Sequence, residues 1–397
     1  MAEKNRAASL KPGAGTWCKG FIHTGLRSGW IVAVLAVLFA FLIGAILIVI
    51  AGANVGEAYY AMFRGAIFDP EARNFTRSIM PITNTLIYAA PLIIAGLGLG
   101  FGFKAGLFNI GGTGQLIFGA LGAIWVGTKL SLPMGLHLIV ALLVAMIAGG
   151  IYAGIAGVLK AKTGANEVII TIMLNSIASL AIAYLLSLKY WQSAGSINPQ
   201  TSEAAATARL PLLLPAPFKL HLGIVIAVLA TIAYWWILKR STFGFELQAV
   251  GANPHAANTA GMSIARVTTL TMVGSGVFLG LAGANQALGT IGYVTAGVAG
   301  SIGFDAITVA LLGRNTPIGI FCSGLLFGAF QAGGYAMQTK GVPIDMILIL
   351  QSLIVLFIAA PALVRFIVRL PKPDGKSLRE YVATMADNSA ATKGEAA

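Results

Sequence analysis

Long apolar runs recur along this 397-residue sequence, and they constrain its fold more than any other feature. The run from Trp30 to Gly52 has about 23 residues, enough for a helix to cross a hydrocarbon core of about 30 Å. Further runs lie at about 82–102, 106–127, 135–159, 168–189, 221–238, 267–288, 292–313, 317–338 and 343–368. The sequence therefore predicts an all-α polytopic membrane protein with about ten transmembrane helices.

The composition excludes an ordinary water-soluble globule. Hydrophobic residues make up 57% of the chain and charged residues only 10%, which leaves too little polar surface. The 49 glycines follow no collagen-like period, and small residues suit close helix packing in lipid. A cleaved signal peptide is the competing interpretation of the first run, but the run is too long for one.

The basic residues predict the orientation. Most lie in alternate connections and in the two terminal segments, which places both ends in the cytoplasm by the positive-inside rule. The same rule explains the net charge of +13 without a nucleic-acid partner. We expect a cytoplasmic arm over 1–29, a transmembrane permease domain over 30–370 and a cytoplasmic tail over 371–397.

The polar stretch 239–266 lies between two of the apolar runs. Asn253 is suited to cap a helix whose first residue is Pro254, and Gly261 is suited to end it in a left-handed conformation. This short, alanine-rich helix is flanked by Lys239, Arg240 and Arg266, as a cytoplasmic connection should be. It fits either a docking element for a partner protein or a simple connector between two spans.

Signals of enzyme chemistry are missing from the sequence. The four histidines are far apart, no zinc-protease or serine-hydrolase motif occurs, and Gly375-Lys376-Ser377 lacks the first glycine of a phosphate-binding loop. We therefore expect no catalytic residues, no metal site and no cofactor bound by this chain.

Uncharged polar side chains within the apolar runs are candidates for a transport path. An unsatisfied amide in an apolar span is costly, so each should bond across helices or face water. As a set they favour a path for a neutral polar solute, because amides and hydroxyls bind such a molecule without a counter-charge. The candidates are Asn84, Tyr88, Asn109, Gln115, Asn175, Asn285 and Gln286.

Two acidic residues and one amide are candidates for a gate or for helix ends. Asn166 and Glu167 stand at the start of a span, where a carboxylate suits a helix N-terminus. Asp305 lies within or near a span, and it could equally cap a short helix beginning near Phe304. An ion-coupled secondary transporter, which remains a distant alternative, would need Glu167 or Asp305 as its coupling site.

Glycine patterns predict close packing in several spans. Gly276 with Gly280, and Gly324 with Gly328, form G-x-x-x-G pairs. The alternation of glycines over 96–102 fits either close helix approach or a helix break at a cavity. Segments 108–123 and 299–315 each place glycines before a short apolar helix, which suggests a two-fold internal repeat.

Four ordered motifs resemble a known family. They read GLFNIGGTGQL at 106–116, ANEVIITIMLNSIA at 165–178, FGFELQAVGANPHAA at 243–257 and GFDAITVALLGRNTPIG at 303–319. The chain resembles permease subunits of ABC importers in the ribose, branched-chain amino acid and nucleoside branch, and is most similar to nucleoside-type permeases labelled simple-sugar permeases. The resemblance covers about residues 80–370. The family commonly has an acidic residue where Gly112 and Thr113 stand here.

The resemblance implies an importer subunit in a bacterial cytoplasmic (inner) membrane, carrying nucleosides or a related neutral polar solute. Simple sugars or branched-chain amino acids are the alternatives. The implied partners are a cytoplasmic ABC ATPase that binds ATP and Mg²⁺, a second homologous permease, an extracytoplasmic solute-binding lipoprotein and membrane lipid. The resemblance makes the stretch 239–266 the ATPase-coupling loop, with Phe243, Gly244, Glu246, Gly251, Asn253, Pro254, Ala257 and Gly261.

Overall fold

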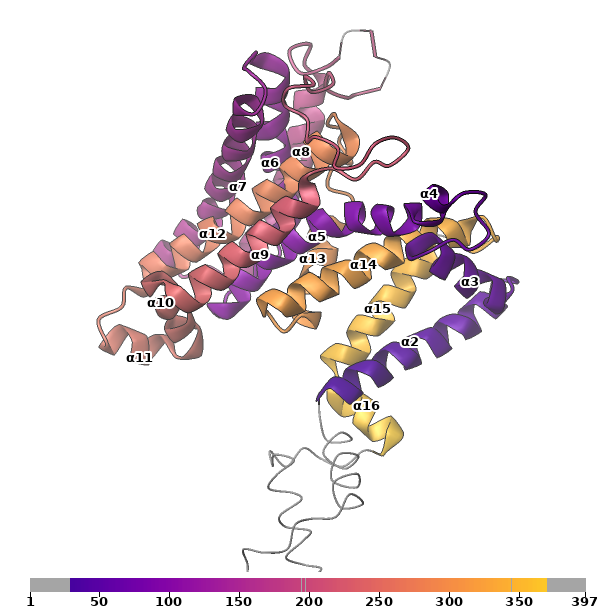
Figure 1. Cartoon of the computed structure of the whole chain (residues 1–397). Helices are drawn as coiled ribbons and strands as arrows, with labels where there is room; N and C mark the ends of the chain where they lie inside the picture. The colour runs from indigo at the N-terminus through magenta and orange to yellow at the C-terminus, as the bar shows by residue number, and fades with distance from the viewer. Residues whose placement is uncertain (1–28, 194, 197, 344, 370–397) are drawn as a thin grey trace, which may run out of the picture. The chain divides into compact units, whose positions relative to one another are not determined.

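The computed structural model describes residues 29–369 except 194, 197 and 344 (Figure 1). The described residues form helices joined by turns, with three isolated β-bridges and no strand among them. The predicted all-α polytopic membrane fold is therefore confirmed. The arm predicted over 1–29, apart from Gly29, and the tail predicted over 371–397 lie outside the described residues.

The chain divides into two compact units, residues 51–347 and residues 1–50 with 348–397. The described part of the smaller unit holds α2 (Gly29–Ile50), α15 (Asp345–Ala359) from Leu348 onward, and α16 (Pro361–Val368). The rings of Phe39 and Phe357 pack with centroids 5.9 Å apart. Ala36 and Ala40 are buried whereas Leu38 and Leu42 are exposed, so α2 packs through its small residues.

The larger unit contains the remaining helices. They are α3 (Val55–Ala66), α4 (Phe75–Ser78), α5 (Met80–Lys104), α6 (Gly112–Lys129), α7 (Leu136–Thr163), α8 (Glu167–Ser187), α9 (Gly223–Arg240), α10 (Thr242–Ala252), α11 (Pro254–Thr259), α12 (Ile264–Asn285) with the π-helical turn η2 (Gln286–Ile291), α13 (Ile302–Leu312) and α14 (Pro317–Gln338).

Helix α5 forms the centre of the larger unit. Every residue from Ala89 to Gly102 is buried, and α5 contacts α9, α12, α13 and α14. Its 25 residues correspond to about 37 Å at 1.5 Å per residue, which exceeds the thickness of a hydrocarbon core. A single helix therefore connects the two ends of the unit.

The alternating glycines of α5 permit close helix approach. The helix is continuous from Met80 to Lys104, so the interpretation as a helix break is wrong. A Cβ on Gly98 would lie 2.7 Å from the carbonyl oxygen of Ser275 in α12, and a Cβ on Gly96 would lie 2.9 Å from Val309 in α13. Larger residues at these positions would push the neighbouring helices away.

The G-x-x-x-G pairs also pack as predicted. A Cβ on Gly276 or Gly280 would collide with backbone carbonyls of Gly149 and Ala145 in α7. A Cβ on Gly328 would lie 2.7 Å from the backbone nitrogen of Ala89 in α5. Small residues therefore set the spacing between α12 and α7 and between α14 and α5.

The boundaries of several predicted spans differ from the helices. Residues 292–301 are not helical, and α13 has only 11 residues, too few to cross a bilayer, so the predicted span over 292–313 is wrong. Helix α6 begins at Gly112 rather than at residue 106, after a non-helical segment. The run 343–368 is interrupted at Ala360, before Pro361 begins α16.

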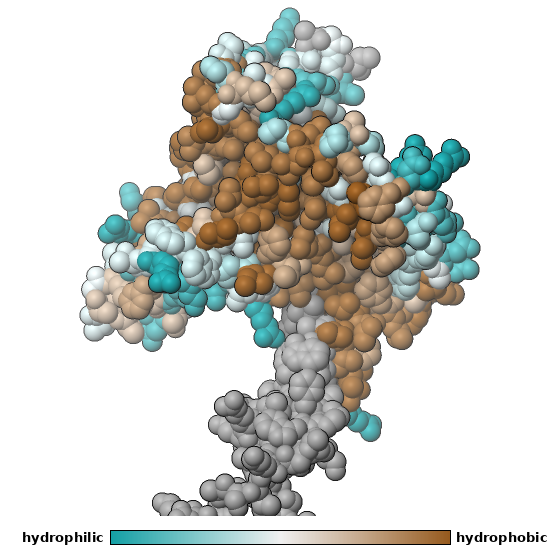
Figure 2. All heavy atoms as spheres, in the orientation of Figure 1, coloured by the Kyte–Doolittle hydropathy of each residue, from teal (hydrophilic) through white to brown (hydrophobic). Residues whose placement is uncertain are grey.

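Six helices of the described chain are long and apolar enough to cross a membrane, and two shorter apolar helices accompany them. The count of ten spans and the orientation with both ends inside remain predictions. Figure 2 shows hydrophobic residues covering much of the helical surface, with hydrophilic residues gathered around α10 and α11, around α3 and α4, and at the loops before α9. This distribution suits a protein whose helices face lipid between polar ends.

Candidate functional site

The connection between α9 and α12 contains two helices. Ser241 caps α10, its hydroxyl accepting the N–H of Gly244 at 2.9 Å. Asn253 ends α10 and caps α11, its side-chain oxygen accepting the N–H of Ala256 at 3.1 Å. Gly261 has φ +86°, a left-handed conformation that disfavours other residues. The cap, the first proline and the terminating glycine of α11 are confirmed, whereas α10 was not predicted.

Two glycines hold α10 against the spans. A Cβ on Gly244 would collide with the backbone of Ile237 and Leu238 in α9. A Cβ on Gly251 would collide with the backbone of Lys104 and Ala105 at the end of α5. The connection therefore touches the central helix directly, with no side chain of Gly251 between the two backbones.

Other candidate residues of the connection differ in exposure. Phe243 is half-buried, its ring centroid 6.0 Å from that of Phe101 in α5, and Glu246 is also half-buried. Ala257 is only 4% exposed, so it packs inward and cannot itself meet a partner. The exposed side chains of the short helix α11 are Pro254, His255, Ala256, Asn258 and Thr259.

The non-helical segment before α6 is held by one face of α8. Glu167 accepts the N–H of Phe108 at 3.3 Å, and Thr171 accepts the N–H of Ile110 at 3.2 Å. Asn175 accepts the N–H of Gly114 and donates to the carbonyl of Ile110, both at 2.8 Å. Glu167, Thr171 and Asn175 follow one another at intervals of four residues, so their side chains share one face of α8. They satisfy backbone groups that the break between α5 and α6 leaves free.

The beginning of α8 is fixed by its own caps. Asn166 caps α8 by accepting the N–H of Val168 at 2.9 Å. The Glu167 carboxylate also forms an ion pair with Lys160 of α7 at 2.6 Å. The structure thus places both candidates at a helix end, where their hydrogen bonds are satisfied within the protein.

Asn109 and Gln115 form a buried amide pair. Each amide donates to the other at 3.0 Å, and Asn109 also donates to Ser275 of α12 at 2.9 Å and accepts the N–H of Gly111 at 2.9 Å. Both are almost fully buried. The pair joins the start of α6 to the middle of α12, and its amide groups are engaged within the protein.

The first turns of α6 and α13 meet at glycines. A Cβ on Gly112 would lie 2.9 Å from the carbonyl oxygen of Gly303. Asp305, in the first turn of α13, accepts a hydrogen bond from Ser301 at 2.6 Å. Asp305 therefore stands at a helix end, half-buried, next to Phe304, which is 58% exposed.

Another buried polar cluster lies where α9 begins and α12 ends. Asn285 donates to the carbonyl of Gly223 at 3.1 Å, and His221 accepts the N–H of Gly223 at 3.1 Å. Burial lowers the pKa of His221, two residues before α9, to about 4. Gln286 is half-buried at the start of η2. Asn285 and Gln286 are thus separate from the Asn109 pair.

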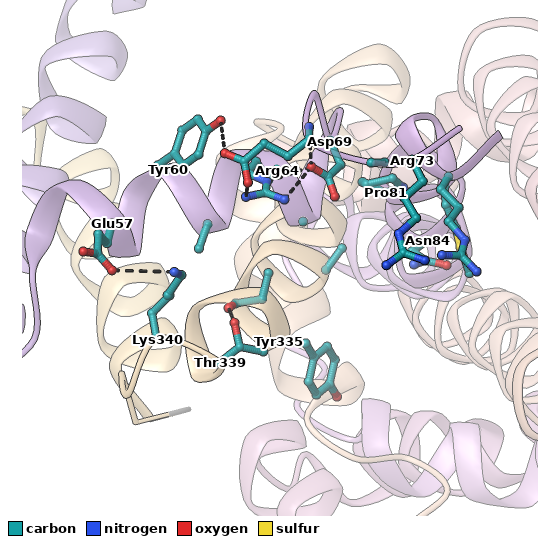
Figure 3. A pocket seen from close by; sticks show the side chains of 18 residues that line it. Glu57, Tyr60, Arg64, Asp69, Arg73, Pro81, Asn84, Tyr335, Thr339 and Lys340 are labelled. Carbon is teal, nitrogen blue, oxygen red and sulfur yellow. Dashed lines mark hydrogen bonds and ion pairs between the residues drawn. The ribbon is translucent and has the colours of Figure 1, made fainter. Parts of the chain in front are cut away.

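A cavity of about 790 Å³ lies at the end of the unit where α5 begins (Figure 3). It is bounded by α3, by the segment before α5 and by the end of α14. Asn84 lines it, as does Tyr335, which is 46% exposed. The ring of Tyr335 packs against that of Tyr88, with centroids 5.7 Å apart. Two path candidates, Asn84 and Tyr88, are thus brought to this cavity or next to it.

The charges of this cavity are partly paired. Arg64 forms ion pairs with Asp69 at 2.7 Å and with Glu71, and Lys340 lies 3.6 Å from Glu57 (Figure 3). Arg73 and Arg77 also line the cavity, without an ion-pair partner among the described residues. No motif within 54–80 or 332–340 identifies this cavity in the sequence, because the fold is needed to bring the two segments together.

The path candidates therefore lie in three places: the cavity beside Asn84, the Asn109–Gln115–Asn175 region and the Asn285–Gln286 region. Among the residues that the structure describes, no group of three or more His, Cys, Asp and Glu side chains could hold a metal ion. Helix α5 runs from the cavity beside Asn84 to the connection formed by α10 and α11.

Comparisons with known proteins agree on one class. Residues 81–359 match the family model described as branched-chain amino acid transport system, permease component. The guanosine ABC transporter permease protein NupP of Bacillus subtilis is 37% identical over 87% of this chain and 97% of its own length. The glucose ABC transporter permease protein TsgB13 of Haloferax volcanii is 35% identical over 82% and 86%.

A third relative is the nucleoside ABC transporter permease protein NupB of Lactococcus lactis, which is 32% identical over 89% of this chain and 96% of its own length. No solved structure was found to match the chain.

Proposed function

The chain belongs to the family of branched-chain amino acid transport system permease components and is a permease of the ABC importer class, and on that premise we propose that it imports nucleosides. Relatives named for guanosine and for nucleosides support this solute class. The 35% identity with a glucose permease keeps simple sugars as the second candidate.

One observation carries the mechanism: α5 joins a solute-sized cavity to the connection formed by α10 and α11. Met80, Pro81 and Asn84 line the cavity at one end of α5, and Lys104 touches Gly251 at the other. Movement of α10 and α11 by a partner would therefore shift the buried helix that borders the cavity. This is the arrangement that an ATP-driven permease needs, since its energy source lies at the opposite end from its solute entry.

The partner that moves the connection is an ABC ATPase, which binds ATP and Mg²⁺, whereas this chain binds no cofactor. Exposed side chains of α11, including His255 and Asn258, supply the contact surface. The connection then lies in the cytoplasm, with Lys239, Arg240 and Arg266 near the membrane surface. The other residues of the predicted coupling loop, including Ala257, keep the connection in its folded conformation.

The other end of α5 then faces outward, in a bacterial cytoplasmic membrane. The cavity beside Asn84 is the entry point for solute delivered by an extracytoplasmic binding lipoprotein. An exposed tyrosine ring and an amide suit a nucleoside, because the ring can stack on a base and the amide can hydrogen-bond it. A second homologous permease, together with this chain's permease domain over 30–370, completes the membrane part.

The gate of the transport path is the contact between the first turns of α6 and α13. Their first turns touch at Gly112 and Gly303, and Asp305 stands next to this contact. Asn166 and Glu167 act on it indirectly, through the α8 face that holds the segment before α6. A displacement of α5 would reach this contact because α13 packs on α5.

Uptake by the complete system tests the solute. In cells that contain this chain with its partners, uptake of radiolabelled guanosine should be inhibited by unlabelled nucleosides and not by ribose, glucose or leucine. Inhibition by glucose alone would favour the sugar candidate, and inhibition by leucine alone would favour a branched-chain amino acid.

A further inference from the structure

A second cavity, of about 670 Å³, lies where α10 and α12 begin. Three basic side chains line it, those of Lys239, Arg240 and Arg266, together with one carboxylate, that of Glu246. None of the four has an ion-pair partner among the residues described. The cavity therefore carries an excess of positive charge that the described chain does not neutralise.

Backbone groups add to this charge. The hydroxyls of Ser241 and Ser263, which also line the cavity, cap α10 and α12. Each accepts one N–H, that of Gly244 at 2.9 Å and that of Arg266 at 3.4 Å. The other N–H groups of each first turn have no partner within their helix. Together with the three basic side chains, these N–H groups favour the binding of an anion in the cavity.

An exposed apolar surface of α9 leads to the cavity. Trp235 and Trp236 are exposed one turn before Lys239 and Arg240, at the position of an interfacial aromatic belt. The Arg240 guanidinium lies over the Trp235 ring, 5.9 Å from its centroid. Leu229, Ile232 and Trp236 are exposed and share one face of the helix.

We propose that this cavity binds the phosphate of an anionic phospholipid, whose acyl chains lie along the Leu229, Ile232 and Trp236 face of α9. An exposed apolar surface next to the cavity favours a phospholipid, whose acyl chains would cover that surface. An acidic segment of a water-soluble partner would leave the surface uncovered. The lipid comes from the cytoplasmic leaflet, a placement that rests on the proposed function. Its phosphate contacts the first turn of α10 and stabilises the position of α10 against α5.

Native mass spectrometry of the full-length chain measures this binding directly. The purified chain is titrated with phosphatidylglycerol and, separately, with phosphatidylcholine. We expect phosphatidylglycerol to bind more tightly. Replacing one basic residue by Gln should weaken phosphatidylglycerol binding about fivefold, since each basic residue near an anionic surface contributes about 1 kcal/mol. Phosphatidylcholine binding should not change.

The variants are Arg266→Gln alone and the triple variant Lys239→Gln, Arg240→Gln and Arg266→Gln. Lys162→Gln is the matched control, because Lys162 is exposed in the last turn of α7 and does not line the cavity. Glu246→Gln removes the carboxylate of the cavity and should strengthen phosphatidylglycerol binding. This opposite shift keeps the test decisive if the triple variant does not fold.

Three results would overturn the proposal. The first is equal phosphatidylglycerol binding by the wild type, Arg266→Gln and Glu246→Gln. The second is competition by glycerol 3-phosphate at the same concentrations as the lipid, which would show a site for a small soluble anion. The third is complete displacement of the lipid by the purified ATPase partner, which would show a protein interface. Because uptake is not measured, failure here would leave the proposed importer function intact.

Discussion

At the residue scale, Asn175 is the polar side chain whose role the structure defines most closely. It satisfies the Ile110 carbonyl and the Gly114 N–H on either side of the turn that opens α6. Its amide therefore bonds backbone groups in the non-helical segment before α6 and in the first turn of α6. This is the structural role expected of a polar residue in a span, a hydrogen bond to a neighbouring segment, rather than direct contact with solute. A transport role for Asn175 then depends on the segment that it holds.

Asn175→Leu should destabilise the protein. The change leaves one donor and one acceptor of two partly buried hydrogen bonds without a partner, at a cost of at most about 1–3 kcal/mol. Thermal unfolding of the purified protein in detergent should show a lower midpoint. The control is Ser179→Ala, one turn away on α8, because the exposed Ser179 hydroxyl donates only to the Asn175 carbonyl of its own helix. Equal midpoints for the two variants would contradict the role assigned to Asn175.

His221 gives the protein a pH-dependent stability. Its pKa is about 4 in the folded protein and near 6.5 when exposed, so the unfolded chain binds more protons between these values. The contribution of His221 to the free energy of unfolding is fully present above about pH 6.5. It should be lost as the pH decreases toward 4, by on the order of 3 kcal/mol in total.

Thermal unfolding of wild type and His221→Gln between pH 4 and 8 measures this contribution. Other groups also titrate in this range, so the informative quantity is the difference in slope between the two proteins. The variant should lose less stability below pH 6.5 than the wild type. Parallel curves would show that His221 does not contribute.

At the scale of elements, α10 connects the partner-facing helix α11 to the central helix α5. Its contact with α5 depends on the absence of a side chain at Gly251. The proposed coupling route therefore includes this backbone contact, besides the packing of Phe243 on Phe101, and a methyl group added at Gly251 tests it.

Gly251→Ala should reduce uptake strongly without preventing membrane insertion. The added methyl cannot fit beside Lys104 and Ala105, so α10 must shift, at a cost of about 1–3 kcal/mol for overpacking. Ala252→Val is the control, since Ala252 is the exposed next residue. Radiolabelled uptake and the amount of protein in the membrane are measured together. Normal uptake in Gly251→Ala would remove this contact from the coupling route.

The exposed face of α11 permits a second test at this scale. Asn258→Arg places a bulky charge on the surface proposed to contact the ATPase, and should lower both uptake and recovery of the ATPase with the purified permease. Thr163→Arg introduces the same residue at another exposed position, the end of α7, and should leave both unchanged. An unimpaired Asn258→Arg variant would place the ATPase contact elsewhere.

At the scale of the whole molecule, local signals in the sequence predicted local features. Asn253, Pro254 and Gly261 predicted α11 because caps and turns depend on neighbouring residues. The glycine pairs predicted close packing because their spacing places them on one helix face. The apolar runs predicted a membrane protein because the length and hydrophobicity of a span are properties of one continuous segment.

Features that depend on distant residues were not predictable. Asn109 bonds Ser275, 166 positions away, and nothing in either segment identifies the other. The run 292–313 is apolar enough for a span, but the short helix α13 starts where Gly303 meets α6. Helix α10 is packed through Gly244 and Gly251, which locally read as helix-weakening residues.

The central claim is that ATP hydrolysed by a partner drives nucleoside import through this chain. Uptake of radiolabelled guanosine into proteoliposomes that contain the complete system, with ATP and Mg²⁺ on the ATPase side, tests it most directly. We predict uptake that requires ATP and the ATPase, that nucleosides inhibit, and that an ion gradient cannot replace. Uptake driven by an ion gradient without ATP, or uptake unaffected by nucleosides and inhibited by glucose or leucine, would contradict the account.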